Sequence, residues 1–193
     1  MPNEAINVKN LESSIHEKLD GEINPEKDIK MLDLDGDGKE EYVVKYKVKY
    51  KENPLRIMIL SEKNGKPVIQ DEIKNVGKEF DEVEYIDINN DGKLEIVAGY
   101  KVGNSLSKGL SIYEYKDGKA VEIFEEYYSE YILRKSKDDN TTDIVIIKEK
   151  EKDTKSYACL YRWQEDGFEN TKKVEIDPTL NTKDEIFDKL LKK

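Results

Sequence analysis

Cysteine and histidine are almost absent from this chain of 193 residues, which removes two common catalytic side chains. Cys159 is the only cysteine and His16 the only histidine. A single cysteine cannot form an internal disulfide, and its alternation with Tyr157 and Tyr161 in an apolar run predicts a small buried side chain. We expect His16 at the surface of a helix. No serine, cysteine or lysine stands in a recognisable nucleophile setting, so the sequence indicates a protein that is not an enzyme.

Positive charge is outnumbered, and long apolar runs are missing. Asp and Glu total 43 against 33 Lys and Arg, which gives a net charge of −10. Nucleic acids and anionic membranes attract proteins through basic patches, so neither is an expected partner. No stretch is apolar enough to insert into a membrane. A secretory signal is also missing, and we expect that one has been removed.

Acidic loops are what the sequence has in abundance. The segment DLDGDGKEE places Asp33, Asp35, Asp37 and Glu41 at loop positions 1, 3, 5 and 9. Like charges this close repel one another, and a calcium ion, which takes six to eight oxygen ligands, would compensate them. Glycines at positions 4 and 6 suit a left-handed backbone. A solvated acidic turn is the alternative, because Asp and Gly are common turn residues.

A second loop repeats these offsets 54 residues later. The segment DINNDGKLE places Asp87, Asn89, Asp91 and Glu95 at the same four positions. Asn89 keeps an oxygen ligand without the charge, and Asn90 stands at position 4, where asparagine tolerates a left-handed backbone. Two matched loops favour metal binding over a chance acidic turn, and they predict two calcium sites.

Neither loop is an EF-hand, which carries a bidentate glutamate at position 12 and a helix on each side. Position 12 is Val44 in the first loop and Ala98 in the second. The residues that follow are β-branched or aromatic, as strands prefer. We therefore expect each loop to join two strands.

The pattern D-x-D-x-D-G-x-x-E followed by a strand resembles the calcium loops of FG-GAP and VCBS repeats, the blades of integrin-α-like β-propellers. The resemblance covers about 27–176 and implies that each loop binds calcium between two strands of a blade. It also implies an exported bacterial protein, often a surface lipoprotein. The implied ligands are Asp33, Asp35, Asp37, the Lys39 carbonyl and Glu41 in one site, and Asp87, Asn89, Asp91, the Lys93 carbonyl and Glu95 in the other.

Hairpin turns indicate three repeats. Asn64-Gly65, Asp117-Gly118 and Asp166-Gly167 lie between alternating runs and recur after 53 and 49 residues. Such dipeptides signal β-hairpins, and a hairpin plus the two strands around a loop makes four antiparallel strands per repeat. We predict a mainly β single domain over 1–193, a partial propeller-like array of three tandem blade-like repeats at about 27–76, 77–127 and 128–176.

Helical patterns flank the array. Apolar residues at i, i+4 and i+8 predict a helix over 10–20 that ends at Gly21. A capping box of Thr182 and Glu185 predicts a second helix over 183–192. We expect these helices to cover exposed ends of the sheets. Three blades are too few to close a ring, so we expect either an open arc with covered ends or a homo-oligomer that joins two arcs.

The third loop, KSKDDNTTD, departs from the pattern. It places Lys135 and Lys137 at positions 1 and 3, and Asp139 and Asp143 at positions 5 and 9. Ammonium groups in place of carboxylates predict a metal-free loop in which a lysine pairs with Asp139 or Asp143. The alternative is a slipped register in which Asp138, Asp139 and Asp143 form a distorted third site.

Extracellular calcium modules bind the ion at about 10⁻⁴ to 10⁻³ M, so loops of this kind suit a compartment rich in calcium. The sequence predicts a calcium-binding, non-enzymatic module, extracellular or anchored to the cell surface, with a protein or carbohydrate ligand. The alternatives are an architectural domain that self-associates to complete a larger propeller and, less favoured, a hydrolase. Tyr127, Tyr128 and Tyr131 are candidates for a ligand patch, although packing between blades is the favoured interpretation.

Overall fold

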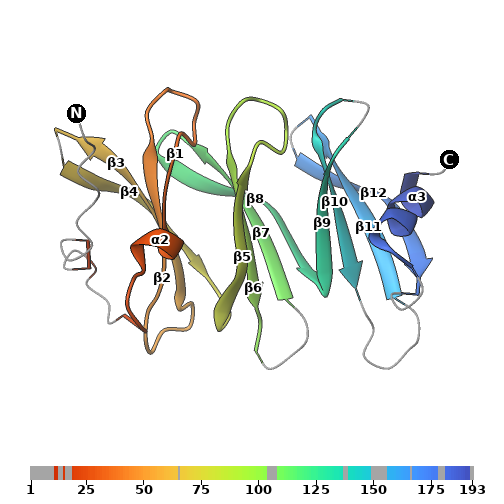
Figure 1. The fold of residues 1–193 in the computed structure, drawn as a ribbon, viewed down its shortest axis with the longest axis horizontal. Coiled ribbons are helices and arrows are strands. Elements are labelled where there is room, and N and C mark those ends of the chain that lie inside the picture. Colours follow the sequence, from red (N-terminus) through yellow and green to blue (C-terminus); the bar gives the residue numbers. More distant parts are fainter. Residues whose placement is uncertain are drawn as a thin grey trace.

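The computed structural model describes residues 11, 12, 15, 19–64, 66–103, 108–136, 139–148, 156–165, 167–177 and 181–191. Within these residues the strands form three four-stranded antiparallel sheets, which follow one another along the chain (Figure 1). The predicted fold class, mainly β with three four-stranded antiparallel repeats and short helices near the termini, is confirmed.

Each sheet keeps its strands in sequence order. The first sheet contains β1 (Ile29–Leu32), β2 (Glu41–Lys47), β3 (Leu55–Lys63) and β4 (Lys66–Asn75). The second contains β5 (Glu79–Ile86), β6 (Glu95–Lys101), β7 (Lys108–Lys116) and β8 (Lys119–Tyr128). The third contains β9 (Glu130–Lys135), β10 (Thr142–Lys148), β11 (Ser156–Gln164) and β12 (Gly167–Ile176).

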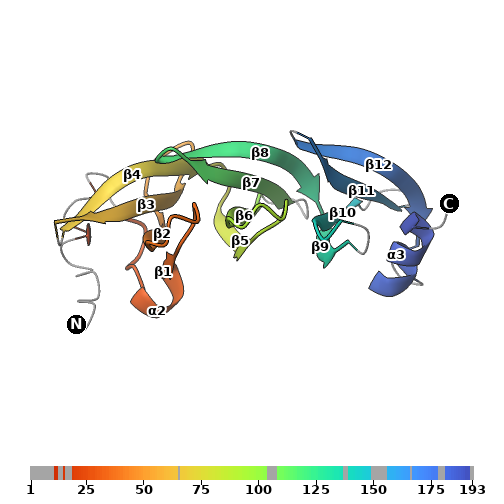
Figure 2. The same cartoon turned by 90° about the horizontal axis from the view of Figure 1, so that it is seen from above.

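The sheets pack face to face. Figure 2 shows β4, β8 and β12 along one side of the array and β1, β5 and β9 along the other. Alternate residues of the central strands point to opposite faces, and both faces are buried. Val43 and Ile57 pack against the second sheet, for example, and Val97 and Ile112 pack against the third. Central strands buried on both sides hold the three sheets in one continuous stack.

The two end faces of the stack are also covered. Leu11, Ile15, Leu19 and Ile23 pack against the outer face of the first sheet. At the other end, α3 (Lys183–Leu191) lays three buried side chains against the third sheet, namely Ile186, Phe187 and Leu190. The predicted capping box is present, because the Thr182 N–H donates to Glu185 Oε2 at 2.8 Å and the Glu185 N–H donates to Thr182 Oγ1 at 3.3 Å.

The N-terminal segment differs from the prediction. The predicted helix over 10–20 extends too far, because Leu19 forms an antiparallel bridge with Val48. Residues 13, 14 and 16–18, including His16, lie outside the described residues. The short α2 (Pro25–Asp28) was not predicted. It begins after Asn24, whose side chain accepts from two backbone N–H groups. None of the helices in the described part of the chain has the length and apolarity of a membrane span.

The third hairpin turn lies one residue earlier than predicted. Gln164, the last residue of β11, pairs with Gly167, the first residue of β12. The sequence favoured the Asp-Gly pair, yet Gly167 already belongs to β12. The second and third hairpins are therefore 48 residues apart, the same spacing that separates Glu95 from Asp143.

The candidate tyrosine patch divides into packed and exposed members. Tyr128 is buried, and Tyr131 meets it edge to face with ring centroids 5.1 Å apart. Tyr127 is 54% exposed. Packing between the second and third sheets therefore accounts for Tyr128 and Tyr131. Cys159 is buried in the same core, as predicted.

Candidate metal centres

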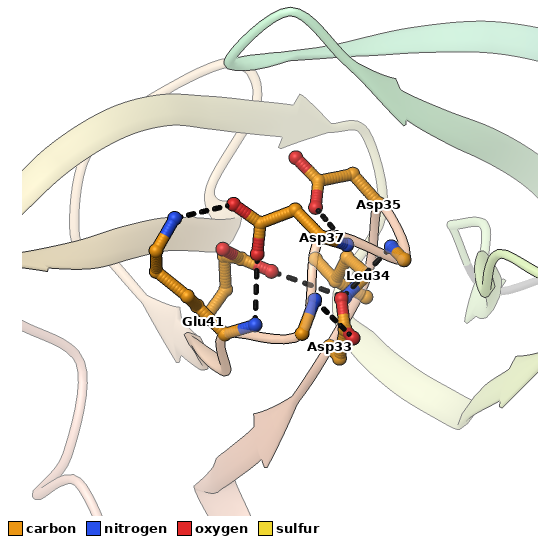
Figure 3. Close-up of polar contacts among 8 residues, drawn as sticks. Asp33, Leu34, Asp35, Asp37 and Glu41 are labelled. Atoms are coloured by element: carbon orange, nitrogen blue, oxygen red, sulfur yellow. Dashed lines mark hydrogen bonds and ion pairs between the residues drawn. The ribbon is translucent and has the colours of Figure 1, made fainter.

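The loops that join β1 to β2 and β5 to β6 lie on one edge of the array, at the top of Figure 1. In the first loop, Asp33 closes the turn by accepting from the Gly36 N–H at 2.8 Å and the Gly38 N–H at 2.9 Å (Figure 3). Both glycines have positive φ, 73° and 83°, which side-chain-bearing residues rarely adopt. The glycines therefore allow the chain to wrap around the carboxylates.

The wrapped loop gathers three aspartates. Carboxylate oxygens of Asp33, Asp35 and Asp37 lie within 4.8 Å of one another and could hold a metal ion. The Lys39 side chain points outward, 79% exposed, and its Nζ pairs with Asp37 Oδ2 at 2.7 Å. Glu41 lies beneath the loop, where its Oε2 accepts from the Leu34 N–H at 3.0 Å. Burial, and then the charges of the three aspartates, raise the pKa of Glu41.

The second loop repeats this geometry. Asp87 Oδ2 accepts from the Gly92 N–H at 3.1 Å, and Asn89 Oδ1 accepts from the Asp91 N–H at 3.0 Å. Asn90 adopts the predicted left-handed backbone with φ 63°. The Lys93 N–H donates to Asp91 Oδ1 at 2.9 Å, as the Lys39 N–H does to Asp37 in the first loop. The two loops therefore share the hydrogen bonds from position 6 to position 1 and from position 7 to position 5, and the second has an amide in place of one carboxylate.

Glu95 is the most confined acid of the second loop. It is fully buried, and its Oε2 accepts from the Ile88 N–H at 2.8 Å. Its Oε1 is buried, and within the described part of the chain it has no hydrogen-bond partner. Burial first, and then the charges of Asp91 and Asp87, raise the pKa of Glu95 to about 7 against the opposing hydrogen bond from Ile88. A buried carboxylate oxygen with no partner is costly, so this site requires compensation.

The described part of the third loop keeps the backbone shape but changes the chemistry. Asn140, at position 6, has φ 62°, like the glycines at that position in the other loops. Lys135, at position 1, donates from Nζ to the backbone carbonyls of Asp87 at 2.9 Å and of Asn140 at 3.2 Å. The Asn140 side chain also donates to Asn90 Oδ1 at 3.0 Å. The lysine thus joins the third loop to the second.

The cation that faces Asp143 is an arginine that the sequence did not reveal. Asp143 is 3% exposed, and Arg162 on β11 donates to it from Nε at 3.1 Å and from Nη2 at 3.4 Å. We expected a lysine of the loop as a partner; Lys135 donates to backbone carbonyls instead, and a pairing through Lys137 stays a prediction. Asp139 instead accepts from the backbone N–H and hydroxyl of Thr141. Lys137 and Asp138 lie outside the described residues.

Neighbouring loops are joined by a repeated backbone hydrogen bond. The Leu94 N–H donates to the Leu34 carbonyl at 3.1 Å, and the Thr142 N–H donates to the Ile88 carbonyl at 2.7 Å. In both cases position 8 of one loop donates to position 2 of the loop before it. The loop edge is therefore a connected row rather than three separate turns.

No family model matches the chain, and no curated protein matches it, so membership of the FG-GAP and VCBS families stays a prediction. Among solved structures, the chain is similar to the exotype rhamnogalacturonan lyase YesX, with 13% identity and a TM-score of 0.47 over 83% of this chain and 36% of that one. It is also similar to the Bacillus licheniformis rhamnogalacturonan lyase PL11, with 16% identity and a TM-score of 0.47 over 80% and 35%. The chain spans about a third of the length of these lyases.

Proposed function

We propose that the chain is a calcium-binding, non-enzymatic binding module that works outside the cell or on its surface. The observation that carries this proposal is the buried Oε1 of Glu95, which has no hydrogen-bond partner among the residues that the structure describes. Its loop neighbours Asp87, Asn89 and Asp91 contribute further oxygen atoms rather than positive charge. A cation held by these oxygens would compensate the buried carboxylate.

Calcium suits both loops better than magnesium or zinc. Each loop offers oxygen ligands only, from three side chains, one backbone carbonyl and one glutamate. Calcium accepts six to eight oxygens in irregular geometry, whereas magnesium requires a near-ideal octahedron and zinc prefers imidazole and thiolate. The proposed ligands are Asp33, Asp35, Asp37, the Lys39 carbonyl and Glu41, and Asp87, Asn89, Asp91, the Lys93 carbonyl and Glu95.

A binding role is favoured over catalysis because calcium accounts for the carboxylates of both loops. Cys159 is buried between the second and third sheets, so its thiol cannot reach a substrate as a nucleophile. Loops of modest affinity are occupied continuously at extracellular calcium concentrations, which supports an extracellular or surface location. A protein or a carbohydrate is the proposed type of ligand.

The architectural alternative, self-association into a larger propeller, is less favoured. Ring closure would require a free blade face at each end of the array. Leu11 is 2% exposed against the first sheet, and Phe187 is 1% exposed against the third. The covered ends instead support an open arc that acts as a single chain.

Thermal unfolding with calcium, with a chelator and with magnesium tests the proposal. At about 1 mM calcium and a Kd of about 0.1 mM, each site should add about 1.4 kcal/mol to the free energy of unfolding. Titration calorimetry should give two ions, and one ion for Asp37→Ala or Asp91→Ala. Asp188→Ala, an exposed aspartate on α3, is the control and should keep both ions. An unfolding temperature that does not change with calcium, or that rises equally with magnesium, would refute the proposal.

A further inference from the structure

Position 9 of each loop begins or adjoins a strand, and it faces a different residue on the next strand. Continuing the observed antiparallel register by one pair, Glu41 faces Ser61, Glu95 faces Glu114 and Asp143 faces Arg162. Paired residues of an antiparallel sheet project their side chains to the same face. The three acids therefore meet a small hydroxyl, a second carboxylate and a guanidinium.

In the third loop the facing residue is itself a cation. Both nitrogen contacts from Arg162 reach the buried Asp143, one to each carboxylate oxygen. Lys135 occupies position 1, where the other loops have an aspartate, and it binds backbone carbonyls. The acid at position 9 of the third loop is thus already paired with the positively charged side chain of Arg162.

In the second loop the facing residue adds negative charge. Glu114 belongs to β7 beside Glu95, and its charge contributes to the raised pKa of Glu95. Like charges directly opposite on neighbouring strands are destabilising unless something lies between them. Glu114 is thus a second carboxylate on the strand beside Glu95, and a cation between the two would relieve their repulsion.

In the first loop the facing residue leaves space. A pocket of about 340 Å³ opens beside the loop, and Ser61 is part of its wall. The same pocket is lined by Asp35, Asp37 and Glu41, with Gln70 and Tyr115 on its other walls. An ion held by these acids would face the pocket instead of a further carboxylate.

We propose that the residue opposite position 9 determines whether each loop binds a cation and how complete the coordination shell of that cation is. Arg162 replaces the ion, Glu114 closes the shell of the ion in the second loop, and Ser61 leaves the ion in the first loop open to an oxygen ligand from the pocket. The first site then accepts water in the free protein, and a hydroxyl or carboxylate oxygen of a bound partner can displace it. This inference rests on the proposed binding of calcium by the first two loops.

Terbium luminescence tests the inference without knowledge of the ligand. Terbium(III) substitutes for calcium at oxygen sites, and its decay rates in H₂O and D₂O give the number of coordinated waters. Asp91→Ala isolates the first site, and Asp37→Ala isolates the second. We expect more waters on the first ion. Ser61→Glu should remove about one of them, and Glu114→Ala should add about one to the second ion, because the first change adds one potential oxygen ligand and the second removes one.

Glu62→Gln is the matched control, because it removes a charge from the same pocket without changing the residue opposite Glu41. Its water count should equal that of the unmodified first site. Circular dichroism confirms that each variant is folded. Equal water counts at the two sites, or counts that change with neither the Ser61 nor the Glu114 substitution, would overturn this inference and leave calcium binding intact. Failure of terbium and calcium to bind either site would overturn the proposed function as well.

Discussion

Replacement of Arg162 by methionine should destabilise the protein through Asp143. The carboxylate is 3% exposed, so it cannot recover the lost contact by hydration. Removing one partner of a buried ion pair costs about 3–5 kcal/mol, whereas an exposed pair contributes at most about 1 kcal/mol. The Arg162 side chain is 29% exposed, and solvent therefore screens part of the interaction. We expect Arg162→Met to lower the free energy of unfolding by about 2 kcal/mol.

Urea unfolding of the calcium-free protein measures this loss. The midpoint should fall while the m-value stays constant, since the substitution changes little of the surface that is exposed on unfolding. The double variant Asp143→Leu with Arg162→Met should recover most of the stability, because it removes both charges together. Lys101→Met, which breaks an exposed pair with Glu79, is the control and should leave the midpoint unchanged.

Two results would contradict this reasoning. A loss below about 0.5 kcal/mol would mean that Arg162 does not compensate a charged Asp143. A calcium-induced rise of the midpoint that is larger in Arg162→Met than in the unmodified protein would mean that the third loop can hold an ion. We expect equal rises in the two proteins, because Lys135 stands at position 1 and calcium in the third loop would meet a positive neighbour and too few oxygens.

Three further predictions concern the array. Phe187→Ala should lower the free energy of unfolding by about 3 kcal/mol in urea, since a buried aromatic is lost from the cover of the third sheet, while Leu191→Ala, at a 44% exposed position, should cost little. Gly109→Ala should lower the free energy of unfolding by about 2 kcal/mol, because the new Cβ would lie 2.4 Å from the Tyr100 ring. Gly167→Ala is its control, since a Cβ there has no described atom within 4 Å, and equal midpoints for the two variants would refute this packing. Light scattering should give the mass of one chain, 22.4 kDa, with and without calcium, and a dimer would contradict the covered ends.

The repeat and the two intact loops could be predicted because their signals are local. Aspartates at alternate positions, glycine or asparagine where the backbone turns left, and β-branched residues afterwards all act within about a dozen residues. Gly36, Gly38 and Asn90 adopt the expected positive φ. The same local chemistry placed the capping box of α3. These features depend on neighbours in the chain, so no knowledge of the packing was needed.

The facing residues could not be predicted, because they depend on strand register. A two-residue turn fixes the register of a hairpin, but β10 and β11 are joined by a longer connection, from Lys148 to Ser156. No turn chemistry fixes how such strands align. The contact between Arg162 and Asp143 could therefore not be predicted from the sequence. The misplaced third turn has a related cause, since a glycine that begins a strand was taken for a turn residue.

The row of loops explains why the third loop can differ from the others. Each of the first two is followed by another loop, whose position 8 donates to its position 2 carbonyl. Glu41 and Glu95 accordingly lie on faces that pack against the next sheet. Asp143 lies on the face that α3 covers, at the end of the stack. At this end of the stack Arg162, whose side chain is 29% exposed, reaches Asp143. The third loop therefore carries its own covalently attached cation, and its Lys135 braces the carbonyl of Asp87 in the loop before it.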